Sequence, residues 1–520
     1  MKFCSALFLF TAALCRFAPA APVEPYETDA RPTPTSEIDR AVAARLAALG
    51  LEPAPLCSDA VFIRRAFLDV LGVLPTPPET RNFLRAPGAR KRETLIDRLL
   101  TREEFADYWA NKWSDLLRIK AEFPINLWPN AAQAYHRWVR TAIRDNLPYD
   151  QFARELLTAS GSNFRVGSAN FYRALQSREP AAFARTVALT FMGARAEKWP
   201  DAQLTGLAMC FRAIGYKGTG EWKEEIVFFD PDKFPPGGRA TAIFPDGTVA
   251  PLTSERDPRE VFAAWLIRPE NPWFARALVN RAWYWLLGRG IVHEPDDLRP
   301  DNPPVNPPLL AALERSFVAS DYNVKELFRT ILNSQTYQRS SLACTIDPLA
   351  EANFAHYALR RLDAEVLIDA LNQITGTHEN YSSAIPEPYT FIPERTRATA
   401  LPDGSITSAF LEAFGRPARD TGIESERNNA ITANQRLLLL NSSQVRRKLE
   451  QGPKLQAIFR GQPGAVDKVD ALYLAILSRH PTDEERAIVA AHFAAAGKGN
   501  NAAVDLAWAL VNSAEFLHRH

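Results

Sequence analysis

Outside its first twenty positions, this 520-residue chain contains no long apolar run. A membrane-spanning helix needs about 18 or more consecutive apolar residues, and no later stretch reaches that length. The chain also lacks an excess of either charge, since 61 Lys and Arg balance 60 Asp and Glu. A nucleic-acid-binding surface would require a clear basic excess. We therefore expect no integral membrane span after N-terminal processing and no nucleic-acid partner.

Cysteine is scarce, and no two cysteines have the Cys-x-x-Cys spacing that is typical of haem attachment or zinc binding. Glycine is low, at 24 residues, whereas proline is high, at 39, which favours proline-initiated helices and stiff connections. Beyond the N-terminal segment the cysteines are Cys57, Cys210 and Cys344, an odd number that allows at most one disulfide. We expect all three to be reduced and largely buried. Cys210 lies in an apolar context that should make it unreactive.

Signatures of catalysis are missing as well. The chain has no Gly-x-Ser-x-Gly elbow, no complete phosphate-binding loop and no His-x-x-x-His pair. Its tightest cluster of acidic residues and histidine is His293, Glu294, Asp296 and Asp297, which is most simply interpreted as a solvated loop. The sequence thus predicts no metal site, no cofactor and no identifiable catalytic residue, and it leaves enzymatic activity undecided with a preference against it.

The N-terminus has the features of an export signal. Lys2 is followed by an apolar run over residues 3–15 and by the small-x-small pattern of Ala18-Pro19-Ala20. We predict cleavage after Ala20 or one residue later. A single membrane anchor is the alternative, but the apolar run is shorter than the ~17–25 residues of a spanning helix. The processed protein should therefore lie in the periplasm, in the cell envelope or outside the cell.

Helical patterns dominate the rest of the chain. Ser36 can cap a helix that Gly50 ends, a second helix should span Asp59–Leu71, and Thr76 with Glu79 has the spacing of a capping box. Residues 215–256 are the exception, because glycine and proline alternate there with short β-prone runs. A second irregular stretch covers about 378–408. We predict a mainly α fold with an extended leader (21–35), a helical domain (36–214), an irregular segment with one or two small β-hairpins (215–256) and a second helical domain (257–520).

Two clusters of side chains allow both a structural and a functional interpretation. Trp109 and Trp113 lie four residues apart on a predicted helix, so their rings share a face. Such rings usually belong to the core, although exposed rings could stack on sugars. Glu424 and Glu426, beside Arg427, fit an ion-paired turn better than a pair of catalytic carboxylates.

Several blocks of residues resemble a known pair of domains. The first set is Arg64-Arg65-Ala66-Phe67-Leu68-Asp69, Pro75-Thr76-Pro77-Pro78-Glu79 and Tyr108-Trp109-Ala110. The second set is Asn271-Pro272-Trp273-Phe274-Ala275-Arg276, Val279-Asn280-Arg281, Asp297-Leu298-Arg299-Pro300-x-Asn302-Pro303-Pro304, Arg360-Arg361-Leu362, Phe414-Gly415-Arg416-Pro417 and Glu426-Arg427. In this order they resemble the paired domains of unknown function of secreted planctomycete-type proteins, a cytochrome-associated PSCyt-type domain followed by a PSD-type domain.

The resemblance implies an exported, mainly helical protein, and it implies no known activity. Many relatives carry a Cys-x-x-Cys-His haem motif late in the first domain, but the corresponding stretch here, residues 189–200, has neither cysteine nor histidine. The haem chemistry that the family name suggests is therefore not expected. A redox protein with a non-covalent cofactor is the least favoured hypothesis.

The candidate ligand-binding residues are polar residues within the matched blocks. An arginine fork can hold a carboxylate in two parallel hydrogen bonds, although buried networks of this kind often only fix loops. We favour the structural interpretation, with a polar pocket for an anionic or sugar ligand as the alternative. The residues concerned are Arg281, Asp297, Arg299, Asn302, Arg416, Glu426 and Arg427.

The favoured hypothesis for function is an exported binding or accessory protein that acts with other envelope or secreted proteins or with extracellular polysaccharide. The alternative is a glycan-acting hydrolase or lyase, in which Asp297 with Arg299 and Glu426 with Arg427 would supply acid–base groups and an anion clamp. That alternative requires the four side chains to converge on one cleft that solvent can reach.

Overall fold

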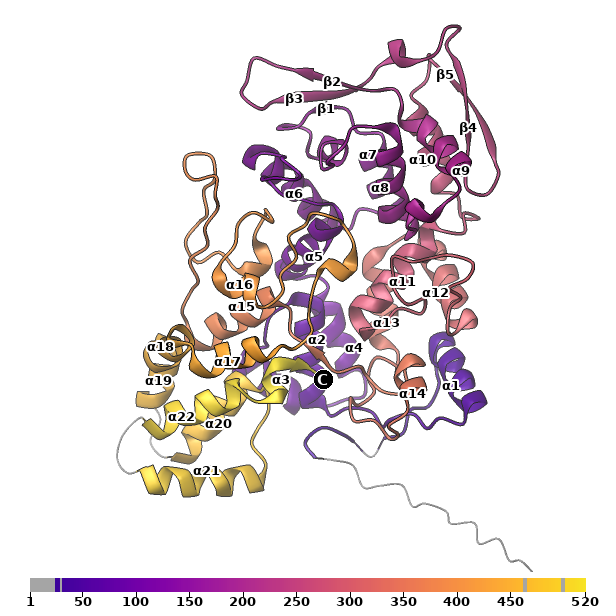
Figure 1. The fold of residues 1–520 in the computed structure, drawn as a ribbon. Helices are drawn as coiled ribbons and strands as arrows, with labels where there is room; N and C mark the ends of the chain where they lie inside the picture. Colours follow the sequence, from indigo (N-terminus) through magenta and orange to yellow (C-terminus); the bar gives the residue numbers. More distant parts are fainter. Residues whose placement is uncertain (1–23, 29, 462–464, 497–500) are drawn as a thin grey trace, which may run out of the picture.

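The computed structural model describes residues 24–28, 30–461, 465–496 and 501–520. The predicted signal peptide, residues 1–20, lies outside the described residues. Helices dominate the described chain, and the strands form small antiparallel sheets, so the prediction of a mainly α fold is confirmed (Figure 1). None of the helices in these ranges is long and apolar enough to cross a membrane.

The first half of the chain is built from helices with clear local signals. Ser36 accepts a hydrogen bond from the backbone N–H of Asp39, and Gly50 ends this helix with a left-handed φ of 68°. Thr76 and Glu79 form the predicted capping box. The helices are α1 (Glu37–Leu49), α2 (Asp59–Leu71), α3 (Pro77–Arg85), α4 (Lys91–Leu99), α5 (Glu103–Leu116), α6 (Pro129–Arg144), α7 (Tyr149–Leu157), α8 (Pro180–Met192) and α9 (Asp201–Ala208).

The predicted hairpins lie at one end of the molecule, at the top of Figure 1. One sheet has the order β1-β3-β2 and the other pairs β4 with β5, all antiparallel. Because β1 comes from the first helical segment, it joins the hairpin that follows to that segment. The strands are β1 (Gly161–Ser162), β2 (Ile214–Gly218), β3 (Glu225–Phe229), β4 (Arg239–Ile243) and β5 (Val249–Thr253).

The second half is again helical and ends in a short strand pair. Strand β6 (Arg360–Arg361) pairs with β7 (His518–Arg519), so the last described residues return to the middle of the molecule. The helices are α10 (Pro258–Leu266), α11 (Phe274–Leu287), α12 (Pro307–Ala319), α13 (Val324–Asn333), α14 (Pro348–Ala352), α15 (Ala364–Thr375), α16 (Ala409–Ala413), α17 (Ala433–Asn441), α18 (Ser443–Gln451), α19 (Pro453–Gly461), α20 (Ala465–Ile476), α21 (Asp483–Ala496), α22 (Asn501–Val511) and α23 (Ala514–Leu517).

The two halves share one hydrophobic core, whose buried side chains run from Ile38 to Phe516. Helix α2 is buried on every side from Val61 onward, as expected of a helix that is surrounded by others. Its two arginines hold the end of the chain: Arg64 Nη2 lies 3.1 Å from the carbonyl oxygen of Phe516, and Arg65 Nε lies 2.8 Å from that of His520. Residues from both halves can therefore build one site.

The three described cysteines are free thiols in different surroundings. Cys57 and Cys210 are buried, as predicted, and burial raises the pKa of Cys210 to about 12. Cys344 is exposed, so the prediction of burial was wrong for this residue. It lies in the irregular connection between α13 and α14, and such connections run over the surface.

We expect exactly one rapidly reacting thiol in protein that begins at residue 21. Cys344 should react with Ellman's reagent in the folded state. Cys57 and Cys210 should react only after unfolding, because their burial keeps the reagent away from the sulfur atoms. Counting the released chromophore in buffer and in guanidinium chloride checks this. A Cys344→Ser variant should release almost none before denaturant is added, and rapid release from that variant would contradict the assignment.

Candidate functional site

The structure places Arg281 at a sealed junction between the two halves. The residue comes from α11, and its side chain is fully buried. Its guanidinium lies 2.7 Å from Oδ1 of Asp296 and donates to the carbonyl oxygens of Leu189 and Thr190 near the end of α8. Arg281 therefore joins the stretch that lacks the haem motif to the second half of the chain.

Three further candidates form a surface loop between α11 and α12. Arg299 Nε lies 3.0 Å from Oδ2 of Asp297, and Arg299 Nη1 lies 2.9 Å from Asp301. The Asn302 amide donates to the carbonyl oxygens of His293 and Asp297, each at 2.9 Å. The polar side chains of this loop are therefore paired with other groups of the same loop, as the structural interpretation expects.

Arg416 and Glu426 also hold the backbone in place. Arg416 donates to the carbonyl oxygens of Asp403 and Ile406, and burial lowers its pKa to about 10. Glu426 accepts from the backbone N–H groups of Asp420 and Thr421 at 3.0 and 3.1 Å. Glu426 thereby shapes the loop that presents its neighbour, Arg427.

Arg427 joins the two halves through buried ion pairs. Its Nη2 lies 2.6 Å from Oδ2 of Asp115 on α5, and its Nη1 lies 2.7 Å from Oε2 of Glu365 on α15. Asp115 Oδ1 also accepts a hydrogen bond from Arg419 Nε at 2.9 Å. Of the seven candidates, Arg427 is the residue that lines the cavity described next.

A polar cavity of about 150 Å³ lies where α5, α11, the β6–β7 pair and the loop after residue 423 meet. On this measure of volume a single water molecule needs about 10–15 Å³, so the cavity is large enough for a small ligand group. Helix α5 contributes Lys112, which lies three residues before Asp115 and therefore shares its face. The charged side chains around the cavity are Lys112, Arg360, Arg361, Asp363, Glu424, Arg427 and Arg519.

The β6–β7 register brings two arginines side by side at this cavity, because Arg360 is paired with Arg519. Arg360 donates to the carbonyl oxygens of Trp285 and Leu286, both at 2.8 Å, where α11 ends and its dipole favours a cation. Asp69 lies 3.5 Å from Arg360 and 3.4 Å from Arg519, so it reduces the repulsion between them.

Asp363 is the best-satisfied carboxylate of the cavity. It lies 3.0 Å from Lys112 Nζ and 2.9 Å from Arg519 Nη2, and it accepts from the Asn429 amide at 2.7 Å. Burial alone would raise its pKa, but Lys112, Arg519 and Arg427 outweigh burial and hold the pKa of Asp363 well below its usual range. Asp363 is therefore a fixed negative charge and not a proton donor.

Lys112 and Glu424 have the opposite kind of environment. Burial, with the nearby Arg427, lowers the pKa of Lys112. Burial also raises the pKa of Glu424, against the attraction of Lys112. An ammonium carries three N–H donors, so the contact with Asp363 does not exhaust Lys112. Both side chains can therefore respond to a charged ligand in the cavity.

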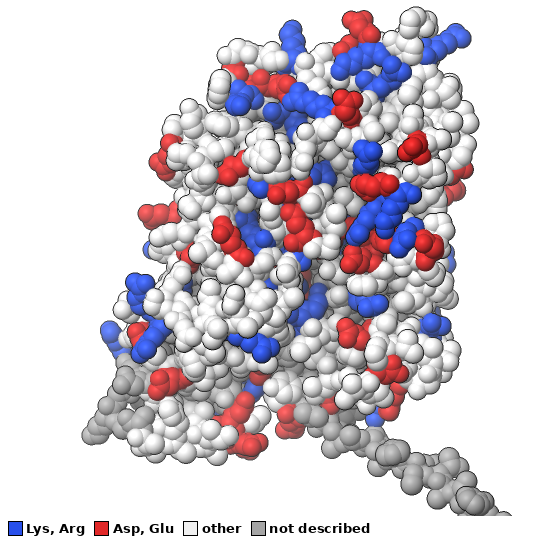
Figure 2. Space-filling view, in the orientation of Figure 1, with Lys and Arg blue, Asp and Glu red and all other residues white. Residues whose placement is uncertain are grey.

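Positive charge is in excess around the cavity. Five cationic side chains and two carboxylates line it. With the directly paired Asp69, Asp115, Glu365, Arg416 and Arg419, seven cations face five carboxylates. On the outer face drawn in Figure 2 the two signs are interspersed, so the basic excess belongs to the interior site and not to that surface. A buried excess of this sign favours an anion.

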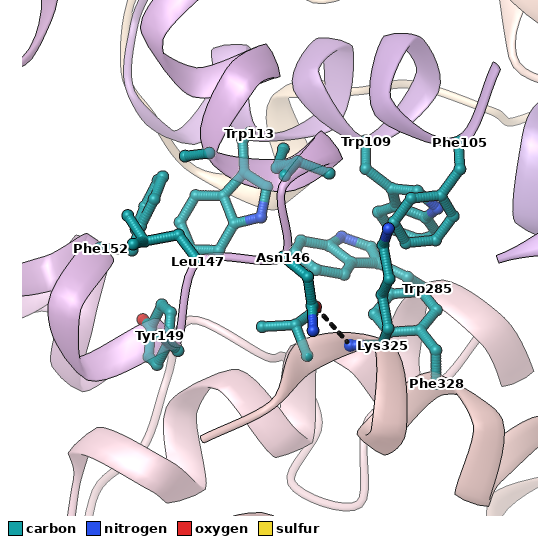
Figure 3. Close-up of a pocket in the computed structure, with 13 residues that line it drawn as sticks. Phe105, Trp109, Trp113, Asn146, Leu147, Tyr149, Phe152, Trp285, Lys325 and Phe328 are labelled. Atoms are coloured by element: carbon teal, nitrogen blue, oxygen red, sulfur yellow. Dashed lines mark hydrogen bonds between the residues drawn. The ribbon is translucent and has the colours of Figure 1, made fainter. Parts of the chain in front are cut away.

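Aromatic side chains form the wall behind the cavity. Rings from α5, α11 and α13 face one another in Figure 3, with centroids 5.2 Å apart for Trp109 and Trp285 and 4.5 Å apart for Trp109 and Phe328. These rings are at most 5% exposed, so they are core and not an open platform for sugars. Trp285 also lines the polar cavity, so this packing fixes the cavity wall.

The sequence interpretation found Arg427 and overlooked the role of its neighbours. Lys112 and Asp115 sit on an aromatic-rich helix, and charges amid Trp109 and Trp113 are a signal of buried polar function that could have been used. Arg361 lies within the Arg360-Arg361-Leu362 block and Asp363 follows it directly, but nothing in the local sequence shows which partners their side chains contact. No group of three or more potential metal ligands occurs within the described ranges.

Comparison with known proteins identifies two domains in the chain. The sequence model of the PSCyt2 family, which is described as a protein of unknown function (DUF1549), matches residues 37–204. The sequence model of the PSD1 family, which is described as a protein of unknown function (DUF1553), matches residues 258–493. The order is the one expected from the sequence motifs. No curated protein and no solved structure matches the chain.

Proposed function

The chain belongs to the proteins that combine a PSCyt2 domain with a PSD1 domain, both of unknown function, and from this premise we propose that it is an exported binding or accessory protein whose buried cavity holds an anionic group of its ligand. The excess of cations around the 150 Å³ cavity carries the proposal. The N-terminal export signal supports a place in the envelope or outside the cell, where partner proteins and acidic polysaccharides offer such groups.

The binding role accounts for the site better than catalysis on glycans does. The catalytic alternative needs Asp297, Arg299, Glu426 and Arg427 in one cleft, and the cavity is lined by Arg427 without the other three. Asp297 with Arg299, and Glu426, instead hold their own loops. A charged, desolvated arginine and lysine set is suited to holding an oxyanion by charge-assisted hydrogen bonds.

We expect calorimetry at constant ionic strength to detect binding of sulfate, acetate or galacturonate, and no binding of neutral galactose. A Lys112→Met variant should bind these anions at least about tenfold more weakly, since a hydrogen bond to a charged group contributes ~1.5–3 kcal/mol. Asp363 retains Arg519, Tyr108 and Asn429 in that variant, so the fold should persist.

Lys325→Met is the matched control for this experiment. Lys325 lies at the aromatic pocket of Figure 3, and its side-chain amine donates to the carbonyl oxygen of Arg144, 3.1 Å away. Its loss should leave anion binding unchanged. Equal binding by the wild type and Lys112→Met, or no binding of any of the three anions, would refute the proposal.

A further inference from the structure

Glu424 differs from the other carboxylates around the polar cavity in its partners. The residue lines the cavity and is 7% exposed, and among the described residues it has no ion-pair partner. The other carboxylates of the site each lie within 3.4 Å of a lysine or arginine nitrogen; they are Asp69, Asp115, Asp363 and Glu365. A buried carboxylate without a paired cation is costly, so Glu424 is the carboxylate of this site that gains most from a proton.

The position of Glu424 is fixed by the junction that Arg281 holds. The backbone N–H of Glu424 donates to Oδ2 of Asp296 at 2.6 Å, and Oδ1 of Asp296 lies 2.7 Å from Arg281 Nη2. The side chains of Arg281 and Asp296 are both buried. Because this junction anchors the backbone, the Glu424 side chain stays at the cavity with and without a ligand.

Charged and titratable groups face Glu424 from each element that packs around it. Helix α5 contributes Lys112 and Asp115, α11 contributes Tyr284, and the loop after α11 contributes Asp296. Burial has the largest effect and raises the pKa of Glu424, and Asp296 and Asp115 raise it further, whereas Lys112 lowers it. The remaining charged groups that line the cavity are Arg360, Arg361, Asp363, Arg427 and Arg519. Glu424 therefore takes up a proton more readily than an exposed glutamate does.

We propose that an anion enters this cavity together with one proton, which Glu424 takes from water. An ionised Glu424 repels an anion that binds beside it at Lys112, whereas a protonated Glu424 can donate its O–H to that anion. The proton adds to a carboxylate oxygen as the anion binds and returns to water as the anion leaves, and no other bond changes. The inference rests on the proposed anion-binding function and names how pH regulates that same site.

Calorimetry of sulfate binding at pH 5, 6 and 7 and constant ionic strength tests the proposal. Sulfate stays fully charged over this range, so a change in affinity reports on the protein. The affinity should fall as the pH rises, by up to about tenfold for each pH unit, which is the limit for one proton per anion. Two buffers of different ionisation enthalpy should give different heats, because the protein draws the proton from the buffer.

Glu424→Gln is the variant that assigns the proton to this residue. The amide has the shape of the protonated carboxyl group and leaves the backbone contact with Asp296 in place. The variant should bind sulfate at pH 7 at least as tightly as the wild type does, with equal affinity at pH 5 and pH 7. Glu412→Gln, which removes an exposed carboxylate from α16, is the matched control and should keep the wild-type pH dependence.

The outcomes separate this inference from the proposed function. If sulfate binds with the same affinity from pH 5 to pH 7 and without proton uptake, the coupling to a proton fails and the anion cavity stands. The wild-type pH dependence in Glu424→Gln, or loss of sulfate binding in that variant, would overturn the role of Glu424. If the wild type binds no anion at any of these pH values, both proposals fail.

Discussion

Replacement of Arg427 by methionine is expected to lower the free energy of unfolding by about 3–5 kcal/mol, the largest single effect that the structure predicts. The side chain is buried and pairs with Asp115 and Glu365, which come from different halves of the chain. Methionine fills much of the volume but leaves Asp115 and Glu365 without the cation that they share. Urea unfolding followed by circular dichroism measures the loss.

Arg299→Met is the matched control, because Arg299 also pairs with two carboxylates. Its side chain is 40% exposed, however, and its partners Asp297 and Asp301 belong to its own loop. We expect a change of about 1 kcal/mol or less, as for other solvent-exposed pairs. Similar losses for Arg427→Met and Arg299→Met would contradict the central role of Arg427.

A double-mutant cycle separates the loss of the ion pair from the loss of packing. Adding Glu365→Met to Arg427→Met removes one of the two carboxylates that have lost Arg427, so the double variant should be less destabilised than the sum of the single variants. We expect a coupling of about 0.5–3 kcal/mol, the usual range for residues in contact. Strict additivity would show that Glu365 and Arg427 contribute to the free energy of unfolding independently of each other.

Acid should destabilise the protein through Glu365. Burial alone would raise the pKa of Glu365, but Arg427 and Arg416 outweigh burial and lower it from 4.5 to about 2. A lowered pKa in the folded state stabilises the protein above the unfolded value of 4.5, and this contribution is lost as the pH falls from 4.5 towards 2. At about 1.4 kcal/mol for each pH unit, the contribution is about 3 kcal/mol.

Urea unfolding at pH 6, 4 and 3 tests this for the wild type and Glu365→Gln. The variant should be less stable than the wild type at pH 6. The difference between the two proteins should shrink as the pH falls, because protonation of Glu365 removes from the wild type the ion pair that the variant lacks at every pH. Glu52→Gln, which changes an exposed carboxylate paired with Arg31, should leave the wild-type profile unchanged. A difference that stays constant from pH 6 to pH 3 would refute the assignment to Glu365.

The local sequence was enough for the helix ends and for the family. Ser36, Gly50 and the Thr76–Glu79 capping box act within a few residues of themselves, and the structure confirms each of them. The haem motif could be excluded from the absence of Cys-x-x-Cys in the whole chain. Burial of Cys210 followed from its apolar neighbours, whereas exposure of Cys344 depended on a loop whose path local sequence does not specify.

The candidate site could be predicted only in part from the sequence. All seven candidates are polar residues of the matched blocks, and the sequence does not distinguish those that hold loops from the one that lines the cavity. Arg281, Arg416 and Arg427 are all arginines with buried side chains, yet the first two hold backbone carbonyls and a carboxylate each, whereas the third lines the cavity. The difference depends on partners that lie far away along the chain, such as Asp115 for Arg427.

The sequence by itself determined the helical class, the capped helix ends, the domain family and the lack of a haem motif, because each of these follows from residues that are neighbours along the chain. Only the tertiary structure decided the charge of the cavity. It is the sum of side chains such as Lys112, Asp363, Arg427 and Arg519, which the packing of α5 against the β6–β7 pair brings together. Burial then sets their pKa values and makes each pairing strong, and burial is a property of the packed molecule.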